Sequence, residues 1–377
     1  MRRSNLTREE AMRNIKRVQL VGWSFAICLL ILASSSWGAS QTVQAKPLTA
    51  GVSVGGIVFN QVTQTGAAGI TVKLWYGKLG GSPSYITTSG INGSFSFAGI
   101  PQGTYVIYAF PPAGYLSVGF NISVGSTDIN NLQLSLKKDL SLLSPPNQSF
   151  VEVAHPWLCW ESMPQANSYW IQINRESDWL LINHPHVFYS ACYRTLGPFV
   201  NGVEYSWGVA SALDAQGVSI GGSGSAFLFT YKTDPVMQAI NQGGDTLLTS
   251  WDGTIHFDFP PGSLDGTGTI TYQRSSQPPT AHPMKAIDKA YDLSSTASLV
   301  ADATYTVTIT YSDRDVIGIE PETLALYAWD VGQGQWVKEP SSQLNAANHT
   351  ITATPNHFST WSVLGDTHRV FLPAIMR

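Results

Sequence analysis

Charged side chains are scarce in this sequence. Asp, Glu, Lys and Arg make up 12% of the 377 residues, whereas hydrophobic residues make up 43%. The exposed faces of helices need Glu, Lys and Arg, so this composition argues against a helical protein. The 34 Gly and 21 Pro suit many short strands joined by tight turns, and they predict an all-β fold. The hydrophobic content and the length are sufficient for the cores of two or three domains and exclude disorder along the whole chain.

Basic residues are also few outside the N-terminus. The first 45 residues hold six basic and two acidic residues, which leaves 15 Lys and Arg against 23 Asp and Glu, a net charge of −8. Nucleic acid and anionic lipid both require a stripe of Lys and Arg on the protein surface. The sequence therefore excludes both as partners, and it contains no motif that predicts a soluble cofactor.

Residues 1–45 have the three-part layout of a secretory signal peptide. The six basic residues lie between Arg2 and Arg17, a 16-residue apolar run follows from Val18 to Ala33, and small residues lead to Ala45. Cleavage is expected after Ala45, with Ala39 as the second choice. The alternative is an uncleaved membrane tether, because the apolar run nearly reaches the roughly 17 to 25 residues that span a bilayer. Either interpretation predicts a secreted or cell-surface protein.

Residues 51–138 are expected to form the first of three tandem β-sandwich modules. Alternating runs such as 70–75 are separated by turn formers, among them Asn92-Gly93, which supplies the positive φ angles of a tight hairpin. The stretch 90–105, followed by Pro-Pro-Ala-Gly-Tyr at 111–115, resembles the carboxypeptidase regulatory-like and Cna protein B-type domains. This resemblance implies a small β-sandwich.

Residues 140–233 are expected to form the second module. Trp160 and Tyr169, together with Leu196 placed before Tyr205, resemble the pattern of a fibronectin type III domain. Period-two alternation then divides one predicted strand into two faces. The inward face is expected to hold Tyr169, Ile171 and Ile173, and the outward face Trp170, Gln172 and Asn174.

Residues 235–365 are expected to form the third module. Its segments 252–264 and 324–337 resemble the β-rich domain shared by ankyrins and netrin receptors. The apolar tail, residues 366–377, is expected to add a final strand to this module. The alternative for the tail is a short terminal tag that awaits sorting.

Cys159 and Cys192 are the two cysteines that remain after removal of the signal peptide. An even count in an exported chain favours a disulfide, and two free thiols are the alternative. Trp160, Tyr193 and Leu196 should face the core, which would leave both cysteines on the outer face. The fibronectin-like topology makes their strands neighbours, so the thiols could meet across that face.

The sequence contains no organised catalytic set. Ser223 lies between glycines but lacks the remainder of a nucleophile elbow. The triplet His357-Phe358-Ser359 matches the site at which some relatives of the third module cleave themselves, where Ser attacks the preceding carbonyl and His moves the proton. In the alternative interpretation, Phe358 only fills the core.

Two tryptophans are the candidate ligand-binding residues. Trp170 and Trp179 are expected near the outer face of the second module, where flat rings can stack on a sugar or on an apolar surface of a partner. The sequence as a whole predicts a non-enzymatic extracellular protein that acts in structural spacing, adhesion or protein binding. The alternatives are a carbohydrate-binding protein and a self-cleaving β domain. The partner would be an extracellular protein or a glycan.

Overall fold

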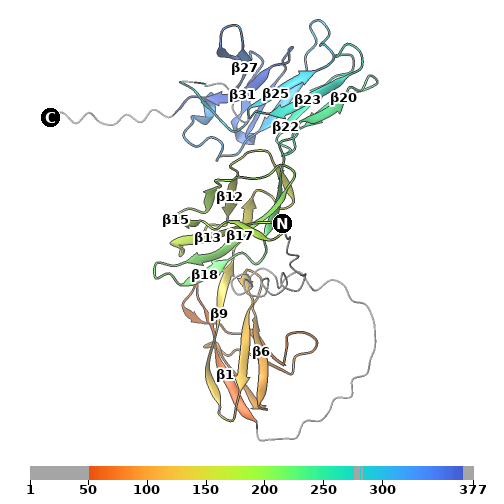
Figure 1. The fold of residues 1–377 in the computed structure, drawn as a ribbon. Helices are drawn as coiled ribbons and strands as arrows, with labels where there is room; N and C mark the ends of the chain where they lie inside the picture. Colours follow the sequence, from red (N-terminus) through yellow and green to blue (C-terminus); the bar gives the residue numbers. More distant parts are fainter. Residues whose placement is uncertain (1–50, 276–280, 282, 368–377) are drawn as a thin grey trace, which may run out of the picture. The chain divides into compact units, whose positions relative to one another are not determined.

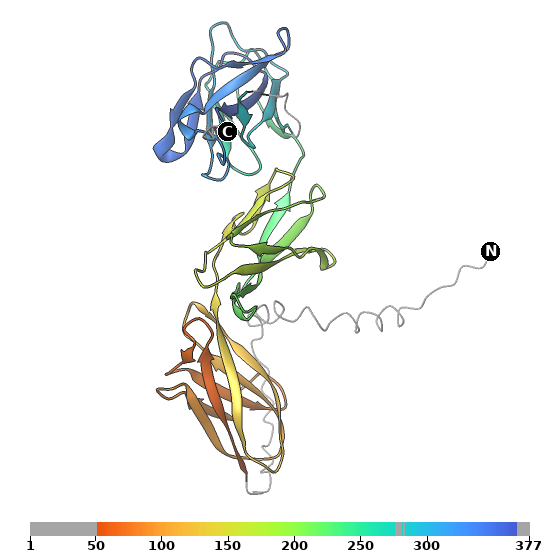
Figure 2. The ribbon, with the colours of Figure 1, turned by 90° about the vertical axis from the view of Figure 1, so that its left-hand side faces the viewer.

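The computed structural model describes residues 51–275, 281 and 283–367. Their regular elements are β-strands and two short 3-10 turns, with no α-helix among these residues, which confirms the all-β prediction (Figures 1 and 2). None of these elements is a helix of the length and hydropathy needed to span a bilayer. The predicted signal peptide and residues 368–377 of the predicted tail lie outside the described residues.

The chain divides into two compact units. Unit 1 holds the described residues up to 146 together with 157–193 and 206–227, and unit 2 holds 147–156, 194–205 and the described residues from 228 onward. The boundaries of the three predicted modules stay a prediction.

The first part of unit 1 is a two-layer β-sandwich. One layer has the order β4-β3-β6-β8, and the other is built on β1, which pairs with β5 in antiparallel and with β9 in parallel fashion. The strands are β1 (Val52–Asn60), β2 (Thr65–Gly66), β3 (Thr71–Tyr76), β4 (Tyr85–Thr88), β5 (Ser94–Ile100), β6 (Gly103–Phe110), β7 (Tyr115–Leu116), β8 (Val118–Val124) and β9 (Ile129–Asp139).

Alternating apolar residues of both layers form the core of this sandwich. Val72 and Leu74 from β3 pack in one cluster with Phe95 and Phe97 from β5, as period-two patterning requires. The predicted Asn92-Gly93 turn lies between β4 and β5, and Gly93 has a φ of 76°. The predicted hairpin is wrong, because β4 and β5 belong to different layers and the turn carries the chain from one layer to the other. Period-two patterning therefore predicts the strands of this region, whereas the turn pair does not show which strands it joins.

Unit 1 continues with a second set of strands, of which β16 and β17 each have an end that belongs to unit 2. β10, β12 and β16 form a three-stranded sheet, while β13 pairs with β14, β15 and β17. The strands are β10 (Leu142–Ser144), β12 (Trp157–Trp160), β13 (Ser168–Arg175), β14 (Leu180–Asn183), β15 (His186–Phe188), β16 (Cys192–Arg194), β17 (Glu204–Leu213) and β18 (Ser219–Gly222).

Unit 2 contains two larger sheets. The first has the order β20-β23-β25-β31-β27-β28 with β24 beside β31, the second has the order β21-β22-β26-β30-β29, and β11 pairs in parallel with β19. The strands are β11 (Ser149–Val151), β19 (Phe227–Tyr231), β20 (Val236–Ala239), β21 (Thr246–Thr249), β22 (Ile255–Phe259), β23 (Thr269–Arg274), β24 (Lys285–Ala286), β25 (Tyr291–Ser295), β26 (Thr306–Thr310), β27 (Ala325–Asp330), β28 (Gln335–Lys338), β29 (Gln343–Asn345), β30 (Thr350–Ala353) and β31 (Thr360–Gly365), with 3-10 turns at Pro321–Thr323 and Ala346–Asn348.

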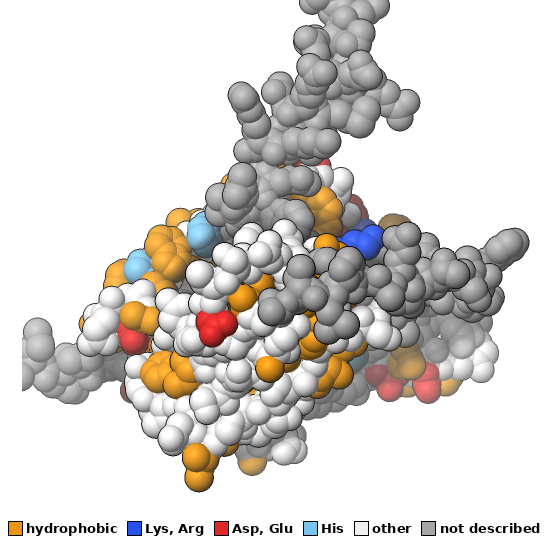
Figure 3. All heavy atoms as spheres, turned by 90° about the horizontal axis from the view of Figure 1, so that it is seen from below, with side chains coloured by type: hydrophobic (Ala, Val, Ile, Leu, Met, Phe, Trp, Pro, Cys, Tyr) orange, Lys and Arg blue, Asp and Glu red, His pale blue; other side chains and the backbone are white. Residues whose placement is uncertain are grey.

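The core of unit 2 lies between these two sheets and is rich in aromatic rings. Phe257 of β22 contacts Tyr272 of β23 and Tyr291 of β25, and Trp361 of β31 is fully buried in the same cluster. The described surface matches the sparse charge of the sequence. Figure 3 shows one face of the molecule, on which uncharged side chains and backbone cover most of the coloured area.

Candidate functional site

The outward face of β13 carries the first candidate site, which lies in unit 1. Burial alternates along this strand, with Tyr169, Ile171 and Ile173 buried and the residues between them partly exposed, so the predicted facing is confirmed. β14 and β15 pair with β13 alone, which makes them an edge of the sheet. Pro185 separates the two short strands and interrupts this edge.

Aromatic and imidazole rings follow one another along this face. The His186 ring stacks on the Trp170 ring at a centroid distance of 4.2 Å and an angle of 8°, and the His184 ring lies 4.9 Å from the Trp170 ring. Phe188 continues the row at 4.3 Å from His186. At the other end Leu181 pairs with Asn174, a residue on the same face of β13 as Trp170. We call Trp170, Leu181, His184, His186 and Phe188 the aromatic strip.

One ring of the strip is held by a hydrogen bond to a buried side chain, and the two ends of the strip are exposed to solvent. The His186 Nε2 atom lies 2.8 Å from the Oγ of buried Ser168, which holds the imidazole in place. Phe188 is 54% exposed, and Leu181 is exposed to a similar degree. The strip can therefore offer apolar surface to a partner, while the stacked His186 ring already covers part of the Trp170 indole.

Trp179 lies apart from Trp170, in the turn between β13 and β14. Its side chain is 69% exposed and its φ is 56°, a left-handed conformation in a turn that the Arg175–Asp178 ion pair closes. No ring contact joins Trp179 to Trp170 among the described residues. The two predicted ligand-binding residues belong to one hairpin but do not form one stacking platform.

The predicted position of the cysteines on the outer face is wrong. Cys159 on β12 and Cys192 on β16 are both buried, although their strands are neighbours in the three-stranded sheet as expected. Leu196 is also wrongly placed, because it is 73% exposed. β16 ends at Arg194, so the period-two alternation does not extend to Leu196. The structure holds the pair as cysteines rather than as a cystine, and the disulfide stays a prediction.

The triplet His357-Phe358-Ser359 lies just before β31. Phe358 packs against the core cluster and stacks with Tyr305 at 5.9 Å, and the His357 ring stacks on Trp361 at 5.0 Å. The Tyr305 hydroxyl donates to the His357 carbonyl at 3.1 Å. These contacts account for the triplet as packing, and self-cleavage at this bond stays a prediction.

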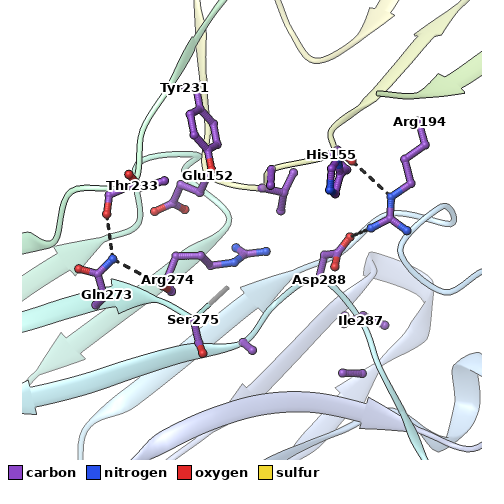
Figure 4. A pocket seen from close by; sticks show the side chains of 14 residues that line it. Glu152, His155, Arg194, Tyr231, Thr233, Gln273, Arg274, Ser275, Ile287 and Asp288 are labelled. Carbon is purple, nitrogen blue, oxygen red and sulfur yellow. Dashed lines mark hydrogen bonds and ion pairs between the residues drawn. The ribbon is translucent and has the colours of Figure 1, made fainter. Parts of the chain in front are cut away.

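A polar cavity of about 470 Å³ in unit 2 forms a second candidate site (Figure 4). Glu152 and His155 line it from the segment after β11, and Arg274 lines it from the end of β23. Figure 4 shows the Arg274 guanidinium extending into the space between Glu152 and the ion pair of Arg194 with Asp288, in which Nη2 lies 2.7 Å from Oδ2. Side chains far apart in the sequence thus converge on one hollow.

Four largely buried charged or titratable side chains form a cluster, and two of them, Glu152 and Arg274, line this cavity. The Oδ2 of Asp252 lies 3.8 Å from Arg274 and 3.7 Å from the Lys289 Nζ. Glu152 accepts a hydrogen bond of 3.3 Å from the Tyr272 hydroxyl. We call Glu152, Asp252, Arg274 and Lys289 the charge cluster.

The turn Asp252-Gly253-Thr254 positions one member of the charge cluster. Asp252 Oδ1 accepts hydrogen bonds from the Thr254 amide at 3.0 Å and from the Thr254 hydroxyl at 2.7 Å, which leaves Oδ2 to face the two cations. Gly253 has a φ of 69°, a conformation that favours glycine. Burial alone would raise the pKa of Asp252, but the charge of Lys289, the bonds from Thr254 and the charge of Arg274 hold it well below its usual range.

Glu152 behaves in the opposite way. Its burial, together with the negative charge of Asp252, raises its pKa to about 7, although the charge of Arg274 opposes the shift. Burial also lowers the pKa of Lys289, and Asp252 counteracts this effect. Near neutral pH the charge cluster therefore contains the basic groups of Arg274 and Lys289 and the ionised carboxylate of Asp252. The carboxyl group of Glu152 is close to its pKa at this pH.

Sequence reasoning did not identify the charge cluster. In the sequence, Asp252 is only the first residue of the segment 252–264 that resembles an ankyrin-type β domain, and Glu152 and Arg274 lie at the ends of ordinary strand patterns. Glu152 is 120 residues from Tyr272, its hydrogen-bond partner. The only local signal is a charged residue beside an apolar strand in a chain where charge is scarce.

Comparisons with known proteins place the first sandwich in a wider group. A family model described as "BOS complex subunit NOMO1-like, second beta sandwich domain" matches residues 49–133. No curated protein matches the chain. This match supports a β-sandwich module at the predicted position, and the predicted order of three module types stays a prediction.

Solved structures with some similarity are remote. A DUF3823 family protein from Bacteroides ovatus has 9% identity and a TM-score of 0.20, and the match covers 48% of this chain and 98% of that chain. The major pilin subunit of Bacillus cereus has 10% identity and a TM-score of 0.20, with 81% and 95% covered. A streptococcal ancillary pilin has 16% identity and a TM-score of 0.21, with 52% and 65% covered. TM-scores this low support no argument about function. The family comparison shows only that residues 49–133 are similar to a NOMO1-like β-sandwich domain.

Proposed function

We propose that this chain is an exported, non-enzymatic binding protein that contacts an extracellular protein through the aromatic strip of unit 1. The observation that carries the proposal is the row of apolar and imidazole side chains along the sheet edge β14–β15, with Phe188 and Leu181 exposed at its two ends. Contiguous apolar surface with a polar surround is typical of protein contact sites.

The composition of the strip favours a protein partner over a glycan. Tyr189, which follows Phe188 and is 82% exposed, adds a side chain that suits an apolar protein surface. A sugar would need an open indole face with polar groups at its edge, whereas His186 already stacks on Trp170. Gln172 and Asn174, the polar neighbours on β13, are hydrogen-bonded to one another at 3.2 Å.

Export supports the same function. The signal-peptide layout of residues 1–45 would place all of the described residues outside the cytoplasm. Tandem β-sandwiches with no organised catalytic set are suited to spacing and contact, although such a fold by itself does not specify an activity.

Photo-crosslinking would test this proposal. A benzophenone amino acid at Tyr189, beside the strip, is expected to crosslink an extracellular protein of the producing organism, whereas the same group at Ile91, an exposed residue of the first sandwich, is not. The paired change Leu181→Ser and Phe188→Ser should abolish the crosslink without unfolding unit 1.

A glycan array run in parallel separates the two partner classes. The proposal expects no glycan signal that depends on the strip. Glycan binding that disappears in the Trp179→Ala variant, with no protein crosslink at Tyr189, would replace a protein partner by a carbohydrate. Equal crosslinking at Tyr189 and Ile91 would show that the strip is not a specific contact site.

A further inference from the structure

We infer that the cavity of unit 2 is a binding site for a small organic carboxylate, held by the guanidinium of Arg274. This site is separate from the aromatic strip and does not depend on the function proposed for it. The inference starts from the state of the Arg274 side chain, which is only 7% exposed. By distance and angle, neither of its terminal nitrogens, Nη1 and Nη2, has a hydrogen-bond acceptor among the described residues, although the Tyr272 hydroxyl interacts with the guanidinium.

An unsatisfied buried guanidinium is costly. Buried charged groups in proteins are normally paired and hydrogen-bonded, because removing their hydration without replacement carries a large penalty. Asp252 reduces the cost through its charge, but at 3.8 Å from Nη1 it is beyond hydrogen-bond distance. The two nitrogens therefore present donors that a bound acceptor group would satisfy.

The guanidinium borders a cavity that can hold a ligand, although Nη1 and Nη2 themselves are almost fully covered in this structure. Arg274 is among the residues that line the cavity, and the guanidinium extends into it (Figure 4). The volume of about 470 Å³ lies in the range of small-molecule sites. The rim adds polar groups, including Gln273, Thr233 and Ser275, which could orient a polar ligand.

The balance of charge favours an anion. Arg274 and Lys289 oppose Asp252, and Glu152 is the fourth member of the charge cluster; Arg194 and Asp288 neutralise one another. When Glu152 carries its proton, the cations exceed the anions by one. His155, which also lines the cavity, has its Nδ1 3.0 Å from the Thr195 carbonyl, and Tyr231 adds a hydroxyl. One additional negative charge would therefore complete the site.

Geometry favours a carboxylate over a more highly charged oxyanion. The planar fork of a guanidinium matches the two oxygens of a carboxylate through parallel hydrogen bonds. A dianion would exceed the single excess charge and would meet the carboxyl group of Glu152 within the same cavity. A carboxylate can come from an acidic sugar or from the C-terminus of a peptide, and both present the same group to Arg274.

Calorimetric titration of the purified chain with four probes tests the inference. D-glucuronate is compared with D-glucose, and the tripeptide Gly-Gly-Gly is compared with its C-terminal amide. The member of each pair that lacks a carboxylate should not bind. Binding of glucuronate alone identifies an acidic sugar as the source of the carboxylate, and binding of the free tripeptide alone identifies a peptide terminus.

Variants connect the binding to the named residues. Arg274→Lys keeps the charge but removes the fork, and it should weaken binding by about tenfold or more. Arg175→Lys, a surface change in unit 1, is the matched control and should leave the affinity unchanged. Glu152→Gln cannot ionise, so it should keep at pH 8 the affinity that the unchanged chain shows at pH 6, while the unchanged chain loses affinity over this range.

If Arg274→Lys does not fold, the affinity of Glu152→Gln at pH 8 still tests the inference against the affinity of the unchanged chain at pH 6 and pH 8. Absence of binding by both carboxylate probes at pH 6 would overturn the inference. Equal affinity for each carboxylate and its counterpart without a carboxylate would do the same. The Leu181→Ser and Phe188→Ser changes should not affect carboxylate binding, so failure of the aromatic strip as a contact site remains distinguishable from failure of this cavity.

Discussion

The aromatic strip and the charge cluster are two candidate sites of opposite character in a β protein with little charge. The strip is local, because its five residues fall within one hairpin region between residues 170 and 188. The charge cluster is assembled from segments around residues 152, 252, 274 and 289 and lies in the interior of unit 2. The strip depends on ring contacts at a partly exposed surface, whereas burial strengthens the electrostatic interactions of the charge cluster. The largest consequences of single substitutions should therefore occur in the cluster.

Replacement of Asp252 should have the largest effect. Asp252→Asn removes the anion that faces Arg274 and Lys289 and leaves two buried cations uncompensated. We expect the free energy of unfolding of unit 2 to fall by about 3 to 5 kcal/mol. Chemical denaturation followed by intrinsic fluorescence would measure the loss.

The matched control lies on the surface of unit 1. Asp178→Asn breaks the exposed ion pair with Arg175, which should change stability little because solvent screens such pairs. Equal losses for the two variants would contradict the contrast between a buried and a screened charge.

The predicted disulfide should have the next largest effect. Cys159 and Cys192 lie on adjacent strands, so air oxidation of the exported chain is expected to join them and to lower the intact mass by about 2 Da through loss of two hydrogens. The bridge should stabilise the chain by about 2 to 4 kcal/mol relative to the reduced form. Mass spectrometry without reduction tests for the bond, and Cys192→Ser is the control. An unreduced mass equal to the reduced mass would rule the disulfide out.

Glu152 should make the folded chain less stable as the pH rises, which is the reverse of the usual effect of a paired carboxylate. Its pKa is raised from an ordinary value of 4.5 to about 7 in the folded chain, so between these values the folded chain binds a proton that the unfolded chain has lost. The contribution of Glu152 to the free energy of unfolding is therefore fully present below about pH 4.5, and it is lost as the pH rises through about 7. Paired carboxylates with lowered pKa values, such as Asp252, act in the reverse direction and lose their contribution at acidic pH.

Glu152→Gln isolates the contribution of Glu152 ionisation to the free energy of unfolding. At pH 8 the variant should be more stable than the unchanged chain by about 1 to 3 kcal/mol, and at pH 4.5 the two should be alike. Thermal unfolding over a range of pH measures the difference. Glu322→Gln, at an exposed carboxyl group in unit 2, serves as the control. A stability difference that does not vary with pH would show that Glu152 does not titrate in this range.

The contrast between a local strip and a cluster assembled from distant segments also explains which features could be predicted from the sequence. Period-two runs and turn pairs such as Asn92-Gly93 are local, and they predicted the all-β fold and the facing of Tyr169 and Trp170. The outward placement of Cys159 failed because alternation was counted from Trp160, whereas both neighbours are buried on this short strand. The charge cluster could not be predicted because it depends on which turns and strand ends meet in space, and period-two patterning does not determine that.

The smallest effect should come from the Trp170–His186 stack, where a double-mutant cycle sharpens the comparison. The two rings are parallel at 4.2 Å on the partly exposed strip, and their coupling should be about 0.5 to 1 kcal/mol, well below the loss at Asp252. Trp170→Ala, His186→Ala and the double variant are compared by chemical denaturation. Replacing His186 should also leave Ser168 Oγ without its ring partner, so His186→Asn, which can retain that hydrogen bond, separates the polar contribution from the stacking contribution. A coupling as large as the Asp252 effect would mean that the strip is a structural core element, and the proposal that it meets a partner would lose its physical basis.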